Sequence, residues 1–175
     1  MICGFQQKFP WGEPTWFREK ILAGAGYATT ETHPLRQLLN HILEPKIHTI
    51  RPGNRWRAGM PIQMAYGVRT KNYQQFNKGI PELEKVVSVQ HVKITWVGAK
   101  DPETYWPKIE VDGNVIGYTR AMKKIVAGLP IIVTTDKTKV IEFVHNDGFD
   151  SITDFCRWFN KDFEGQIIHF TDLRY

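Results

Sequence analysis

Apolar residues recur at three- and four-residue spacing in several stretches of the chain, and this periodicity predicts helices. The first helix is expected to begin with Thr15 as its N-terminal cap and to bury Phe17 and Ile21. Ser151, followed three residues later by Asp154, has capping-box spacing and marks the expected start of the last helix. The expected helices cover residues 15–23, 34–43, 135–145 and 151–159.

Stretches rich in β-branched residues predict strands between and after these helices. The clearest covers 86–97, and Asp112-Gly113 predicts the turn of a hairpin over 108–117. Further strands are expected over 47–51, 61–67, 131–133 and 167–170, with a loop over 71–81. The mixture predicts an α+β fold. Since no internal repeat, low-complexity tract or linker interrupts the pattern, one domain is expected over 1–175.

The bulk composition agrees with one globular domain. A chain of 175 residues with 42% hydrophobic and 23% charged residues can bury one full core. Cys3 and Cys156 are far apart, no CxxC occurs, and the first residues do not resemble a secretory leader. Reduced thiols, a cytoplasmic location and no membrane association are therefore expected.

The positive charge is concentrated in one segment. The net charge is +5, yet the segment from Pro45 to Pro81 contains no Asp or Glu. An anionic ligand would select such a distribution, whereas the alternative is a solvated face that lacks acids. The positive residues of the segment are Lys46, Arg51, Arg55, Arg57, Arg69, Lys71 and Lys78.

A lysine, a histidine, a hydroxyl and an arginine lie close together in Lys46-Ile-His48-Thr49-Ile-Arg51. Such groups can bind phosphate or activate a nucleophile. Because side chains alternate along a strand, Thr49 and Arg51 should share a face opposite Lys46 and His48. Lys46 could join Thr49 if it lies in the turn after Pro45 or at a bulge; the alternative is a polar surface strand.

Arginines flank an indole in the next stretch, where Arg55-Trp56-Arg57 follows Arg51. Guanidinium groups can pair with phosphates, and the face of Trp56 can stack on a base. In the alternative, Trp56 is buried and the arginines cover its rim.

The segment Asn146-Asp147-Gly148-Phe149 predicts a sharp turn between two helices, because glycine allows a positive φ. Asp147 is either a carboxylate that points into a pocket or a turn former. The six histidines have no HxxxH or HxH spacing, so neither a metal nor a cofactor is expected. No GxxxxGK[ST], GxGxxG or GxSxG motif is present.

Taken together, these blocks resemble the ASCH family of PUA-like β-barrels. The resemblance rests on Lys46-Ile-His-Thr49-Ile-Arg51 followed by Gly59, and on residues 146–151 leading into Trp158-Phe159. It implies a small twisted PUA-like β-barrel with helices packed on the outside and a cleft lined by the first block. Members of this family are thought to bind RNA or modified nucleosides.

One bacterial subgroup, an N4-acetylcytidine amidohydrolase, is similar at Lys-x-x-Thr-Ile-Arg. The similarity implies Lys46 as activating base, Thr49 as nucleophile and Arg51 as pocket residue. Asp147 stands where that subgroup has a glutamate, which is longer by one methylene group.

Two functions therefore compete at the level of sequence. The first is binding of RNA, DNA or a modified nucleoside through a basic cleft around 46–57. The second is amide hydrolysis of an acylated nucleoside by Lys46, Thr49 and Asp147. A protein-interaction domain of a mobile element is a further alternative. The expected binding residues are Lys46, His48, Thr49, Arg51, Arg55, Trp56, Arg57 and Phe149.

Overall fold

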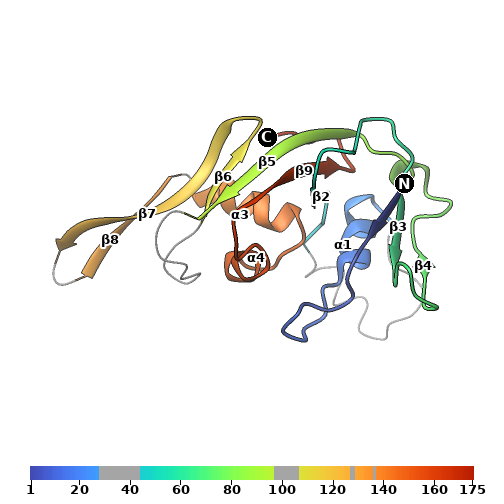
Figure 1. Ribbon diagram of the computed structural model, residues 1–175, viewed down its shortest axis with the longest axis horizontal. Coiled ribbons are helices and arrows are strands. Elements are labelled where there is room, and N and C mark those ends of the chain that lie inside the picture. Colours follow the sequence, from blue (N-terminus) through green and yellow to red (C-terminus); the bar gives the residue numbers. More distant parts are fainter. Residues whose placement is uncertain (28–43, 97–106, 127–128, 136) are drawn as a thin grey trace.

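The computed structural model describes residues 1–27, 44–96, 107–126, 129–135 and 137–175. The helix expected over 34–43 lies outside these ranges. The described part combines helices with two sheets, so the predicted α+β class is confirmed (Figure 1). In these ranges the strands form two separate sheets and no closed barrel. None of the described helices is long and apolar enough to cross a membrane.

The larger sheet is antiparallel throughout and has six strands in the order β2-β9-β5-β6-β7-β8. The β7–β8 hairpin extends away from the rest of the molecule (Figure 1). The strands are β2 (His48–Pro52), β5 (Ser88–Thr95), β6 (Lys108–Val111), β7 (Asn114–Val126), β8 (Leu129–Thr135) and β9 (Phe163–His169).

The smaller sheet has three strands in the order β1-β3-β4. β1 (Ile2–Gly4) runs parallel to β3 (Gln63–Tyr66), and β4 (Gln74–Gln75) runs antiparallel to β3. A short 3₁₀ helix, η1 (Pro81–Leu83), follows β4. β1 had no strand signal in the sequence, because three residues are too few to show an alternating pattern. β4 lies in the predicted loop.

The other predicted strands agree in place with the structure. Asp112 and Gly113 form the expected turn between β6 and β7, and both have positive φ, 49° and 83°. Positive φ at both central residues is the geometry of the type I′ turns that close two-residue hairpins. The strand expected over 131–133 is part of the longer β8.

The described helices are α1 (Phe17–Gly24), α3 (Lys137–Asn146) and α4 (Ile152–Trp158). Ser151 caps α4 as predicted, since its side chain accepts a hydrogen bond from the backbone N–H of Asp154. The expected N-terminal cap of α1, Thr15, was wrong by one residue. Trp16 is the N-cap, with φ 53°. The hydroxyl of Thr15 donates to the carbonyl of Gln6 and also accepts a long bond, 3.5 Å, from the backbone N–H of Phe17 at the start of α1.

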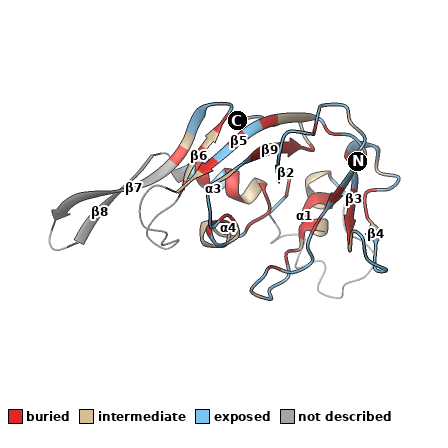
Figure 2. Ribbon diagram, viewed as in Figure 1, coloured by how far each residue is buried: buried red, intermediate tan, exposed pale blue. Residues whose placement is uncertain are grey.

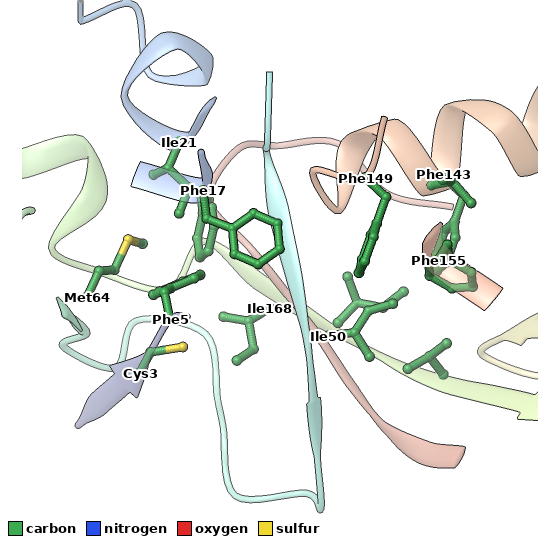
Figure 3. Packing of buried hydrophobic residues seen from close by; sticks show 14 of the residues in the cluster. Cys3, Phe5, Phe17, Ile21, Ile50, Met64, Phe143, Phe149, Phe155 and Ile168 are labelled. Atoms are coloured by element: carbon green, nitrogen blue, oxygen red, sulfur yellow. The ribbon is translucent and has the colours of Figure 1, made fainter. Parts of the chain in front are cut away.

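The core contains many aromatic side chains, and it joins the helices to both sheets. One group of side chains, which includes Phe5, Phe17 and Met64, lies near α1 and the small sheet (Figure 3). A second group comes from α3, α4 and the turn between them. The rings of Phe17 and Phe149 lie 6.0 Å apart and connect the two groups. The residues of α1, β3 and β9 that contribute to this core are buried (Figure 2).

Candidate functional site

The residues just before β2 form backbone hydrogen bonds with three different segments of the chain. The backbone N–H of Lys46 donates to the carbonyl of Lys20 in α1, at 3.0 Å. The N–H of Ile47 donates to the carbonyl of Asn146, the last residue of α3, at 3.0 Å. The carbonyl of Ile47 accepts a bond from Phe170, just after β9. The two sequence blocks that are about a hundred residues apart therefore meet here.

Lys46 and Asp147 form a buried ion pair at this point. The Nζ of Lys46 lies 2.7 Å from Oδ1 of Asp147, and the two side chains are only 2% and 5% exposed. Lys46 also donates to the backbone carbonyl of Asp147. Lys46 lies two residues before the start of β2, so the alternation of side chains along the strand does not constrain it.

The carboxylate of Asp147 also fixes the strand. Its Oδ1 accepts a hydrogen bond from the backbone N–H of Ile50, at 3.2 Å. Ile50 is the neighbour of Thr49, which is 2% exposed. One carboxylate thus contacts both the lysine and the backbone next to the candidate nucleophile. Asp147 lies in the turn after α3, and its carboxylate is buried and bonded to Lys46 and Ile50.

Burial changes the pKa of both members of the pair. Loss of hydration lowers the pKa of Lys46 to about 8, an effect that the nearby Arg51 increases and Asp147 opposes. Loss of hydration likewise raises the pKa of Asp147, against the opposing influence of Lys46. Lys46 consequently holds its proton less firmly near neutral pH than an exposed lysine does.

Gly148 leaves room for the arm of Lys46. Its φ is 86°, and a Cβ atom at this position would lie 2.8 Å from Cδ of Lys46. On its other side, the Nζ of Lys46 lies 4.7 Å from the ring centroid of Phe17. The lysine is therefore confined between a glycine and an aromatic ring, as well as bonded at its end.

A second buried lysine, Lys20, holds the same turn from α1. It is 0% exposed, and its Nζ donates to the carbonyl of Gly148 at 2.8 Å and to Oδ1 of Asp150 at 2.6 Å. Lys20 is not among the site residues that the sequence predicted. The sequence does contain a signal for its burial, because Lys20 lies three residues after Phe17 and next to Ile21, on the same expected buried face of the helix.

Two histidines pack behind the pair and were also not singled out together. The rings of His48 and His169 lie 5.6 Å apart, and the hydroxyl of Tyr175 lies 3.3 Å from Nδ1 of His48. Asn146 donates to the same hydroxyl at 2.8 Å. Burial lowers the pKa of His169 to about 4 and that of His48 well below its usual value, so both imidazoles are neutral at physiological pH.

The other expected binding residues divide into buried and exposed ones. Trp56 and Phe149 are each 1% exposed, so the buried alternative for Trp56 agrees with the structure and its face is not open to a base. Arg55 and Arg57 are exposed. Arg51 is partly exposed; its guanidinium donates to Sγ of Cys3 at 3.3 Å and to the carbonyl of Gly4 at 2.7 Å.

The described residues contain no group of three or more His, Cys, Asp or Glu side chains that could hold a metal ion. Comparison of the whole chain with protein-family models, curated proteins and solved structures finds no match.

We predict that Gly148→Ala destabilises the protein more than Gly53→Ala does. The two glycines have similar φ, 86° and 80°, but a Cβ at Gly53 meets no atom within 4 Å. Both changes should cost about 1–2 kcal/mol for the positive φ. Gly148→Ala should cost about 1–3 kcal/mol more, because the new methyl displaces Lys46.

The free energies of unfolding in urea measure this difference. Equal losses in the two variants would show that the packing of Lys46 against Gly148 contributes nothing to stability.

Proposed function

We propose that this protein binds single-stranded nucleic acid, RNA or DNA, through the exposed cations of the basic segment. The observation that carries the proposal is that these cations have no acidic partner among the described residues, whereas the buried lysines do. An unpaired, hydrated cation is free to replace the counterions of a phosphate backbone. The exposed members are Arg55, Arg57, Arg69, Lys71 and Lys78.

The placement of these cations favours an extended ligand. Arg55 and Arg57 lie in the segment that leads to β3, and Arg69 and Lys71 lie in the turn that follows it. The two groups lie before and after β3 in the chain, and a four-residue strand such as β3 spans about 13 Å. A chain of several phosphates can reach both ends, whereas a single phosphate cannot.

Base stacking by the indole of Trp56 is not part of this proposal, because that side chain is buried. Tyr73, between β3 and β4, is 43% exposed and offers a face for a base. The buried pair of Lys46 and Asp147 then serves to fix the start of β2, from which the basic segment continues.

The ASCH-like, PUA-like barrel remains part of the same proposal. Two contacts support it. Arg51 of β2 bonds Gly4 of β1 and so connects the two sheets, and an isolated bridge joins Pro61 to Lys85 in the segments that lead to β3 and β5. The meeting of the two blocks that carry the resemblance, at Lys46 and Asp147, also supports it.

Binding to a short single-stranded oligonucleotide should weaken linearly on a log–log plot against salt concentration, with a slope of about −0.7 for each phosphate contacted. Replacing both Arg55 and Lys71 by Gln should reduce the slope by about 1.4 in magnitude. Fluorescence anisotropy of a labelled oligonucleotide at several salt concentrations measures the slope.

Lys93→Gln is the matched control, since Lys93 is an exposed lysine of β5 outside the basic segment. This variant should bind as the unaltered protein does. Affinity that stays constant between low and moderate salt, or a loss equal in Lys93→Gln, would contradict the proposal.

A second candidate function is hydrolysis of an acylated nucleoside such as N4-acetylcytidine. The observation in its favour is the lowered pKa of Lys46, about 8, in contact with Asp147, whose carboxylate bonds the backbone next to the buried Thr49. In this proposal Thr49 attacks the amide carbonyl, Lys46 accepts the hydroxyl proton, and Asp147 orients Lys46. The amine leaves with a proton, and water then hydrolyses the acyl–threonine ester.

Mass spectrometry of cytidine release tests this candidate. Thr49→Ala should reduce turnover by more than about a thousandfold, whereas Thr49→Ser should retain a measurable rate because it keeps the hydroxyl. The value of kcat/KM should rise with pH through about 8, because Lys46 acts as a base only after it loses its proton. Turnover that survives in Thr49→Ala, or none in the unaltered protein, would exclude the hydrolase.

A further inference from the structure

A cleft lies between the N-terminal loop and the C-terminal end of α4, apart from the residues discussed so far. Its volume is about 460 Å³, which is within the range of small-molecule sites, about 300–1,000 Å³. The described residues that line it are Gln6, Pro10, Trp11, Arg157, Trp158 and Asn160.

Two indoles give the cleft rigid walls at a steep angle to each other. The ring of Trp11 stacks on the buried Phe9, with 4.7 Å between centroids and 4° between planes. The ring of Trp158 meets the same Phe9 at 81° and 5.9 Å. Trp158 also packs against Phe149, at 6.0 Å. Phe9 stacks on Trp11 and Arg157 lies over the Trp11 ring, so a flat ring stacks on Trp158 and meets Trp11 at its edge.

The polar groups of the cleft suit an anionic, hydrogen-bonding ligand. The guanidinium carbon of Arg157 lies 5.9 Å from the centroid of Trp11, and the side chain is 53% exposed. The carboxylate paired with Arg157, that of Asp154, is 3.9 Å away, so the guanidinium keeps donors free for a ligand. Gln6 and Asn160 add exposed amides, which can both donate and accept.

From this geometry we propose that the cleft is a nucleotide-binding site. The base stacks on an indole, the amides of Gln6 and Asn160 bond its edge, and Arg157 pairs with the phosphate. Arg157 disfavours a cationic ligand, and the planar walls favour an aromatic ring. The site is separate from the basic segment and does not depend on nucleic-acid binding there.

Titration of the ¹⁵N-labelled protein with adenosine 5′-monophosphate tests the site. The indole N–H resonances of Trp11 and Trp158, assigned with Trp11→Phe and Trp158→Phe, should shift and saturate. The resonance of Trp56 should stay in place, because that indole is buried elsewhere in the core and serves as an internal control.

The role of Arg157 is tested by comparing the monophosphate with adenosine. The phosphate should strengthen binding about tenfold in the unaltered protein, as expected for a charge-assisted contact. In Arg157→Gln this ratio should fall to near one, whereas Arg55→Gln should leave it unchanged. Because Arg157 is exposed, Arg157→Gln should fold as the unaltered protein does. Indole resonances that keep their positions in the free variant would verify that it is folded.

Absence of saturable shifts at Trp11 and Trp158 would overturn the proposal. So would equal shifts with a neutral sugar such as maltose, or a tenfold phosphate effect that persists in Arg157→Gln. Loss of binding in Arg55→Gln with Arg157→Gln unaffected would place the nucleotide in the basic segment instead.

Discussion

The buried ion pair between Lys46 and Asp147 is the constraint on which the rest of the described structure depends. It connects the start of β2 to the turn between α3 and α4, and the same carboxylate bonds the backbone of β2 at Ile50. Lys20 holds this turn from α1. Burying such charges is costly unless each finds a partner, so three separate segments must come together for the pair to be tolerated.

The local elements were largely predictable from the sequence, because their signals are local. The Ser151 cap and the Asp112-Gly113 hairpin need no information from distant residues. The arrangement of the strands was not predictable in the same way. β1 pairs with β3 across some sixty residues, and neither its short length nor its composition indicates this. The expected PUA-like barrel came from a resemblance, and the described strands form two sheets.

The candidate site was likewise predictable from the sequence only in part. The sequence indicated Lys46, Thr49 and Asp147, and the structure brings Lys46 and Asp147 into contact. Burial was the property that the sequence could not give. Trp56 is flanked by arginines, as a residue that stacks on a base would be, and yet it lies in the core. Lys20 is a lysine, a type that is usually exposed, and yet it is wholly buried. The side chains that organise the fold are thus buried, whereas most cations of the basic segment are exposed.

A double-mutant cycle on the ion pair measures its organising role most directly. Free energies of unfolding would be compared for the unaltered protein, Lys46→Met, Asp147→Leu and the double variant. Each single change should cost about 3–5 kcal/mol, because it leaves an unpaired buried charge. The double variant should lose at least about 2 kcal/mol less than the sum of the two. Losses that add within about 0.5 kcal/mol would show that the two residues act independently and would contradict a central role for the pair.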